Sequence, residues 1–218
     1  MIRAVVRGFG QTLITLGLVV LLFSAYEVWG KAMQVGAEQH RLRGGLDAAW
    51  AAEPRRQAPV EKLVLGKGMA KMYIPRLGKE WVVVQGVRPV DIKAAPGHYP
   101  ETALPGQEGN FAVAGHRMPS VWWDLDKMRA GDPVVVETAT SWIVYRVYTV
   151  QIVKPTDVWV VAPDPDSPRA AAGTRKLITL TTCNPKWDNY QRLIVHGELT
   201  QEQPKSAGRP AVLAAMKG

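Results

Sequence analysis

Cysteine is nearly absent from this sequence, with one residue, Cys183, among 218. A single cysteine excludes an internal disulfide and any metal site built on paired cysteines. The thiol is therefore either an inert core residue or a reactive group, and composition alone favours the inert alternative. Acidic residues are also in the minority, 19 against 27 lysines and arginines, which leaves a formal net charge of +8.

Much of the basic excess lies outside the expected domain, and the residues that precede it include Arg3, Arg7, Lys31, Arg41, Arg43, Arg55 and Arg56. Such an excess suits a nucleic acid, an anionic membrane or an acidic cell wall. The sequence has no zinc-finger spacing and no helix with clustered base-reading residues. We therefore expect no nucleic-acid partner.

One long uncharged run, GFGQTLITLGLVVLLFSAY, occupies residues 8–26. As a helix it would span about 28 Å, close to the hydrocarbon thickness of a bilayer. Arg3 and Arg7 precede it, which favours a cytoplasmic N-terminus with the rest of the chain outside. A cleaved signal peptide is the alternative, but this run is longer and lacks a small-x-small end. We expect a single-pass cell-membrane anchor with an extracytoplasmic domain.

The segments on either side of the expected domain are irregular. Residues 28–68 show no sustained apolar period and are interrupted by glycine and proline, which predicts a stalk rather than a packed unit. The end of the chain reads QEQPKSAGRP and then a weakly apolar stretch, which predicts a mobile tail. The expected divisions are 1–27 for the N-terminus and membrane anchor, 28–68 for the stalk, 69–200 for the folded domain and 201–218 for the tail.

Short runs rich in Val, Ile, Thr and aromatic residues alternate with turn signals in the expected domain. The runs are 69–74, 81–84, 110–114, 133–138, 142–150, 177–182 and 192–199. Seven or eight short strands at this spacing predict a mainly antiparallel barrel or sandwich rather than repeated βαβ units. Residues 122–129 (WWDLDKMR) predict one or two helical turns.

Cys183 directly follows the strand 177–182, and Asn184 with Pro185 ends that strand. A strand terminus suits a site residue, because a rigid sheet can present a side chain there to a ligand. Arg192 opens the next predicted strand, so two adjacent strands would bring it to the same end of the sheet as Cys183. An arginine at a strand start is more often a solvated surface group.

A thiol nucleophile needs a proton partner, and the chain has four histidines. His40 lies in the predicted stalk, away from the domain. His98 lies in the loop PGHYP, where a turn residue bonded to backbone is the ordinary interpretation. His196 lies about 13 Å from Arg192 along the last strand. His116 ends the strand NFAVAGH, so position favours His116 without excluding His98 or His196.

These segments resemble the sortase family. TLTTC is similar to the family's active-site motif TLxTC, GNFAVAGHR to its histidine segment and QRLIVHGEL to its arginine segment, in the same order. The resemblance covers about residues 69–199. IPRLG, PGHYPETALPGQEGNFAVAGHR and TTCNPKWDNYQRLIVHGEL look most like class E, the housekeeping type of high-GC Gram-positive bacteria.

The resemblance implies a mainly β fold, a closed barrel of seven or eight strands with one or two short helices. It also implies that His116, Cys183 and Arg192 form the catalytic set, and that Tyr99 reads the second residue of the substrate signal. Thr181 and Thr182 flank the thiol and are candidates for substrate contact, and equally for plain β-branched strand formers.

The implied activity is that of a cysteine transpeptidase. It cleaves a sorting signal, Leu-Ala-x-Thr-Gly or Leu-Pro-x-Thr-Gly, between Thr and Gly through a thioester, which an amine of a lipid-linked peptidoglycan precursor resolves. His116 would return a proton to the leaving amine, while Arg192 cannot act as a base and would stabilise the oxyanion. Ordinary pKa values of about 8.5 for Cys and 6.5 for His favour the neutral pair, so both shifted values and a small ion-paired fraction stay open.

Two other functions are compatible with the sequence: a pilin-polymerising sortase that uses a lysine amine, and an inactive peptide-binding module. Glu108, Glu137 and Asp164 lie where some sortases of class A hold calcium, but a matching acidic cluster is not evident, which favours a solvated face. We expect no metal and no cofactor.

Overall fold

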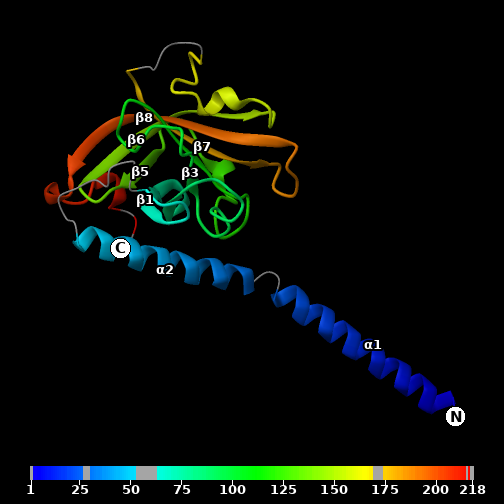
Figure 1. The fold of residues 1–218 in the computed structure, drawn as a ribbon. Coiled ribbons are helices and arrows are strands. Elements are labelled where there is room, and N and C mark those ends of the chain that lie inside the picture. The colour runs from blue at the N-terminus through cyan, green and yellow to red at the C-terminus, as the bar shows by residue number, and fades with distance from the viewer. Residues whose placement is uncertain (1, 27–29, 53–62, 169–173, 215, 217–218) are drawn as a thin grey trace.

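The computed structural model describes residues 2–26, 30–52, 63–168, 174–214 and 216, in which two long helices precede a closed β-barrel (Figure 1). Helix α1 (Ile2–Ala25) points away from the barrel, and α2 (Lys31–Ala52) runs along it. The uncharged run of the sequence thus forms a helix, as predicted. Its stretch Val5–Ala25 is long and apolar enough to cross a membrane, and no part of the most apolar window is buried in the structure.

The hydroxyl groups within α1 are satisfied inside the helix. Thr12, Thr15 and Ser24 each donate to the backbone carbonyl four residues earlier, at 2.8–3.0 Å. Such internal bonds lower the cost of placing a polar side chain in hydrocarbon. Beyond Gln11 the hydroxyl groups of Thr12, Thr15 and Ser24 are therefore the polar side-chain groups of the helix, and all three are satisfied within it.

The barrel has eight strands, in the order β1-β2-β3-β4-β7-β8-β6-β5, closed by pairing of β5 with β1. Their bounds are β1 Gly68–Ile74, β2 Lys79–Gln85, β3 Gly97–His98, β4 Gly109–Ala114, β5 Pro133–Glu137, β6 Ser141–Val153, β7 Lys176–Asn184 and β8 Gln191–Pro204. All seven predicted runs are strands, and the closed barrel is confirmed. The two-residue β3 was not predicted, because its residues read as a turn.

Two strand pairs, β2–β3 and β4–β7, are parallel, and the others are antiparallel. The barrel is filled by alternate side chains, including Met72, Phe111, Ile178 and Leu180. Each such buried side chain contributes about 1.5–3 kcal/mol of hydrophobic stabilisation. The predicted helical turns near Trp122 are a 3-10 helix, Leu125–Lys127.

Helix α2 packs against the barrel and is therefore more than the predicted stalk. Leu42 and Leu46 lie in one buried cluster with Val82 and Val84 of β2. The helix also bonds the edge of β2, where Gln39 Oε1 accepts from the backbone N–H of Val82 at 2.7 Å. Because β3 is only two residues long, it leaves this part of the β2 edge unpaired, and α2 covers it.

The end of the chain also departs from the predicted mobile tail over its described part. Strand β8 continues to Pro204, which pairs with Ser141, the first residue of β6. Beyond it Leu213 is fully buried in a cluster with Tyr73 and Trp142. Pairing with the long strand β6 extends β8 beyond the predicted boundary at residue 200. The buried Leu213 packs the segment after β8 against the barrel.

Candidate active site

Strand pairing brings His116 and Cys183 to the same edge of the sheet. Ala114 of β4 pairs with Thr181 of the parallel strand β7, and each candidate lies two residues further on. Parallel strands end at the same edge, so equal steps beyond a paired position stay side by side. The backbone N–H of Gly115 donates to Thr181 O at 3.0 Å, which continues the pairing past the end of β4.

His116 and Cys183 line one cleft of about 590 Å³. His116 is exposed, and the free thiol of Cys183 is half-buried. The cleft lies between the segment after β4 and the β7–β8 connection, and its lining residues are His116, Arg117, Met118, Pro119, Trp123, Cys183, Lys186, Trp187, Asp188 and Asn189. A substrate in the cleft can reach both reactive side chains from solvent.

Gly115 fixes the backbone immediately before His116. A Cβ at this position would lie 2.6 Å from the ring of Trp122, which is fully buried. Only glycine lets the strand end pass so close to that ring. Thr182 Oγ1 donates to Gly115 O at 2.7 Å, which ties the same residue to β7. The backbone that precedes the His116 imidazole is therefore closely packed.

Arg192 lies directly opposite Cys183 in the β7–β8 pairing. Directly paired residues of antiparallel strands project from the same face of a sheet. The half-buried Arg192 donates from Nη1 to Asn189 O at 2.6 Å and to Gln191 O at 2.8 Å. Both bonds come from one nitrogen, so within the described residues its Nε and Nη2 groups stay available for a substrate.

The candidates for substrate contact take different positions. Tyr99 is half-buried beyond β3, and its hydroxyl lies 3.2 Å from Thr181 Oγ1. Thr181 lies two residues before Cys183 and so shares its face of β7. Thr182 points the other way, is 3% exposed and gives its proton to Gly115 O, so its hydroxyl is committed to the barrel wall.

His98 is buried outside the cleft. Its Nδ1 lies 2.7 Å from Gln85 Oε1, and its Nε2 lies 3.1 Å from both Thr102 Oγ1 and Ala103 O. Burial lowers the pKa of His98 to about 4, against the opposing effect of its bonds to Ala103 and Thr102. This environment is that of a neutral histidine that holds a turn.

His196 is also buried away from the thiol. Its Nδ1 lies 2.8 Å from Thr179 Oγ1, and its ring stacks on Tyr148 at 5.9 Å. Thr179 precedes Cys183 by four strand positions, or about 13 Å. Burial lowers the pKa of His196 to about 4. His40 lies exposed on α2, so of the four histidines only His116 lines the cleft.

The acidic residues weighed as calcium ligands have other environments. Glu137 is buried, not solvated as expected, because it accepts from Tyr73 Oη and pairs with Lys205, both at 2.6 Å. Asp164 lies 3.5 Å from Arg175, whereas Glu108 is exposed. Among the described residues, no three His, Cys, Asp or Glu side chains gather as a metal site would require.

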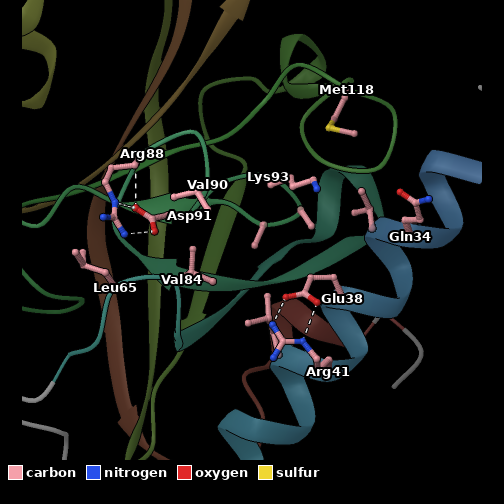
Figure 2. A pocket seen from close by; sticks show the side chains of 15 residues that line it. Gln34, Glu38, Arg41, Leu65, Val84, Arg88, Val90, Asp91, Lys93 and Met118 are labelled. Carbon is pink, nitrogen blue, oxygen red and sulfur yellow. Dashed lines mark hydrogen bonds and ion pairs between the residues drawn. The ribbon is translucent and has the colours of Figure 1, made fainter.

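A second pocket, of about 680 Å³, is larger than the cleft and lies between α2 and the segment that follows β2 (Figure 2). Its charged side chains are largely paired with one another, Arg88 with Asp91 at 2.7 Å and Arg41 with Glu38. Met118 borders both hollows. None of the residues predicted from the sequence lines this pocket, and its paired charges supply no nucleophile or base.

Comparisons with known proteins show the family of the chain. A family model described as Sortase domain matches residues 72–200. The chain is 32% identical over 219 residues to Sortase SrtE1 of Streptomyces coelicolor, which covers 96% of this chain and 61% of that protein. The chain thus spans less than two thirds of that relative's length.

Among solved structures, sortase E from Streptomyces avermitilis shares 41% identity at a TM-score of 0.61 and covers 69% of this chain and 99% of that one. Sortase E1 from Streptomyces coelicolor, with a tripeptide in the active site, shares 32% identity at a TM-score of 0.63, with the same coverage.

Proposed function

The chain belongs to the sortase family, in its class E, and we propose from this that it is a membrane-anchored cysteine transpeptidase with Cys183 as its nucleophile. One observation supports the proposal most. The parallel pairing of β4 with β7 and the antiparallel pairing of β7 with β8 bring His116, Cys183 and Arg192 to one end of the barrel, although His116 is far from the other two in the sequence.

The first half-reaction forms the thioester. The Cys183 thiolate attacks the Thr carbonyl carbon of the sorting signal and forms a tetrahedral oxyanion. When this collapses, the bond between Thr and Gly breaks and His116 gives its proton to the leaving Gly amine. The Cys183–acyl thioester and the neutral imidazole remain.

The second half-reaction reverses these roles. An acceptor amine attacks the thioester carbonyl, His116 takes a proton from that amine, and the Cys183 thiolate leaves. A new amide bond joins the surface protein to the acceptor, and the thiolate–imidazolium pair is restored. One histidine at the cleft serves both steps.

Arg192 acts as a hydrogen-bond donor. Its Nη1 bonds to Asn189 O and Gln191 O hold the guanidinium at the β7–β8 connection. We propose that its other N–H groups donate to the carbonyl oxygen or oxyanion of the bound substrate. Such a donor typically contributes about 10²–10³ in rate.

The substrate is a sorting signal, Leu-Ala-x-Thr-Gly or Leu-Pro-x-Thr-Gly. Tyr99 and Thr181 are the side chains that we propose contact it, because they lie on the Cys183 face of the sheet. Thr182 contributes by fixing Gly115 rather than by direct contact. The Streptomyces coelicolor sortase E1 has a tripeptide in its active site, which supports the proposal that this chain binds a peptide.

The acceptor is the amine of a lipid-linked peptidoglycan precursor. Helix α1 anchors the protein with a cytoplasmic N-terminus, and residues 69–200 form the catalytic domain outside the membrane. The segment 28–68 joins the two, and its helix α2 belongs to the domain by its packing. A single-pass anchor keeps the cleft near a membrane-bound acceptor.

Mass spectrometry can test the proposal on the full-length protein in detergent. Fluorogenic Leu-Ala-x-Thr-Gly and Leu-Pro-x-Thr-Gly peptides are incubated with a panel of amines, including peptidoglycan-type amines and a protein lysine. We expect cleavage between Thr and Gly and transfer to the peptidoglycan-type amine, both abolished in Cys183→Ala. Full activity of Cys183→Ala would contradict the proposal.

The same assay separates the alternatives. Transfer only to a protein lysine would favour a pilin-polymerising enzyme. A thiol that iodoacetamide does not alkylate in the folded protein, together with no cleavage, would favour an inactive peptide-binding module.

A further inference from the structure

Arg117 follows the candidate His116 directly, and its side chain is 3% exposed. The guanidinium donates from Nη1 to Cys183 O at 3.3 Å and from Nε to Trp123 O at 2.9 Å. Its Nη2 pairs with Asp126 Oδ1 at 3.0 Å. All three nitrogens are therefore engaged, as a buried cation requires.

The hydrogen bond from Arg117 to Cys183 O replaces a backbone hydrogen bond that β4 and β7 no longer form at this point. Carbonyl groups alternate in direction along a strand, so Cys183 O points to the same side as Thr181 O. Thr181 O accepts from the backbone N–H of Gly115, the last such bond between these strands. One step further, the Arg117 side chain supplies the donor to Cys183 O that the β4 backbone no longer provides.

The same guanidinium joins the two walls of the cleft. Trp123 and Asp126 belong to the segment after β4, whereas Cys183 is the second-last residue of β7. Asp126 also pairs with Lys186 of the β7–β8 connection at 3.4 Å, and Lys186 lies over the Trp123 ring at 5.2 Å. Arg117 is thus the buried centre of a network behind the reacting side chains.

We propose that Arg117 is a positioning residue for the transpeptidation, acting through the Cys183 carbonyl to hold the thiol-bearing end of β7 in place beside His116. This inference rests on the proposed function. The planar guanidinium is required because three acceptors lie around it, and the single ammonium of lysine cannot bond all of them in this geometry. A misplacement of about 1 Å between reacting groups can cost about 10² in rate.

The test compares Arg117→Lys and Arg117→Gln with the wild type in the full-length protein. We expect kcat for the sorting peptide to fall about 10²-fold in Arg117→Lys, with KM within about threefold of the wild type. Arg146→Lys is the matched control, because Arg146 is exposed on β6 and also donates to a carbonyl, Gly131 O, at 2.9 Å. Its kinetics should be those of the wild type.

Two further measurements separate positioning from plain stability. Thermal unfolding establishes a working temperature well below the melting point of each variant, where a purely structural role leaves kcat unchanged. Iodoacetamide should still alkylate Cys183 in Arg117→Lys, which shows a thiol that is accessible but badly placed. A wild-type kcat in folded Arg117→Lys, or a change confined to KM, would overturn the inference.

Asp126→Asn decides the question if neither Arg117 variant folds. Asp126 is 43% exposed and orients the guanidinium, so this replacement should fold and lower kcat several-fold with KM unchanged. A wild-type kcat would then overturn the inference. If the wild type is active and Cys183→Ala is inactive, the proposed function holds and a wild-type kcat in Asp126→Asn overturns only this inference. A wild type that cleaves no sorting peptide overturns both the proposed function and this inference.

Discussion

Cys183 and Arg192, nine positions apart in the sequence, face each other as directly paired residues of β7 and β8. Their Cβ atoms are therefore held about 4.5–5.5 Å apart by strand pairing. Strand pairing fixes the backbone of Arg192 beside Cys183, although Arg192 is not among the described residues that line the cleft and its guanidinium bonds Asn189 O of the β7–β8 connection. The residues of the β7–β8 connection form one wall of the cleft, and the distance between the Cβ atoms of Cys183 and Arg192 does not depend on them.

Replacing Arg192 by alanine should lower kcat for the sorting peptide about 10²–10³-fold, because the oxyanion loses a donor. KM should change much less, since this interaction strengthens only in the transition state. Steady-state kinetics with the fluorogenic peptide measures both constants. Arg76→Ala is a suitable control, because Arg76 is exposed outside the cleft. Unchanged turnover in Arg192→Ala would exclude it from the catalytic set.

Most of the barrel could be predicted because its strands are short runs rich in β-branched residues, as in Pro133–Glu137 and Lys176–Asn184. Strand β3 could not, since two residues carry no alternation. Strand ends and motifs predicted His116 and Cys183 as partners, and the structure has both at one cleft.

The sequence did not predict the contacts that a few side chains on polar segments make with the barrel. Helix α2 offers the barrel a narrow apolar stripe that includes Leu42 and Leu46, too sparse to predict packing. Nothing in the sequence around Arg117 indicates that it is buried. The structure shows its burial and its three acceptors. Neither the α2 segment nor the segment around Arg117 has a hydrophobic period from which its contact with the barrel could be inferred.

Gln39→Ala should destabilise the domain by about 1–3 kcal/mol, because it leaves the Val82 N–H and the Ala94 carbonyl without their side-chain partner. Urea unfolding followed by tryptophan fluorescence measures the loss. Gln34→Ala, at an exposed position of the same helix, should change stability by less than about 0.5 kcal/mol. Equal stability of the two variants would mean that α2 does not contribute through the β2 edge.

Leu213→Ala should cost about 2–4 kcal/mol, because it opens a cavity in the cluster with Tyr73 and Trp142. Val158→Ala is the control for an apolar truncation at an exposed position and should cost little. Thermal melting of both variants gives the comparison. A melting temperature of Leu213→Ala equal to that of the wild type would show that the end of the chain does not stabilise the barrel.

The stability of the domain should fall with acidity between about pH 6.5 and pH 4 through His98 and His196. Burial lowers the pKa of each to about 4, whereas an unfolded histidine titrates near 6.5. Within this window the unfolded chain binds more protons, so stability is complete above pH 6.5 and is lost as the pH falls. At pH 5 the loss should be about 2 kcal/mol for each histidine relative to pH 7.

Urea unfolding at pH 7 and pH 5 tests this in the wild type and in His98→Asn and His196→Asn. Each replacement lowers stability at pH 7 but removes its share of the difference between the two pH values, because asparagine does not titrate. His40→Asn is the control, since His40 lies exposed on α2 and its loss should leave the difference unchanged. If the two buried-site variants kept the full wild-type difference, other groups would have to be the source of the acid sensitivity.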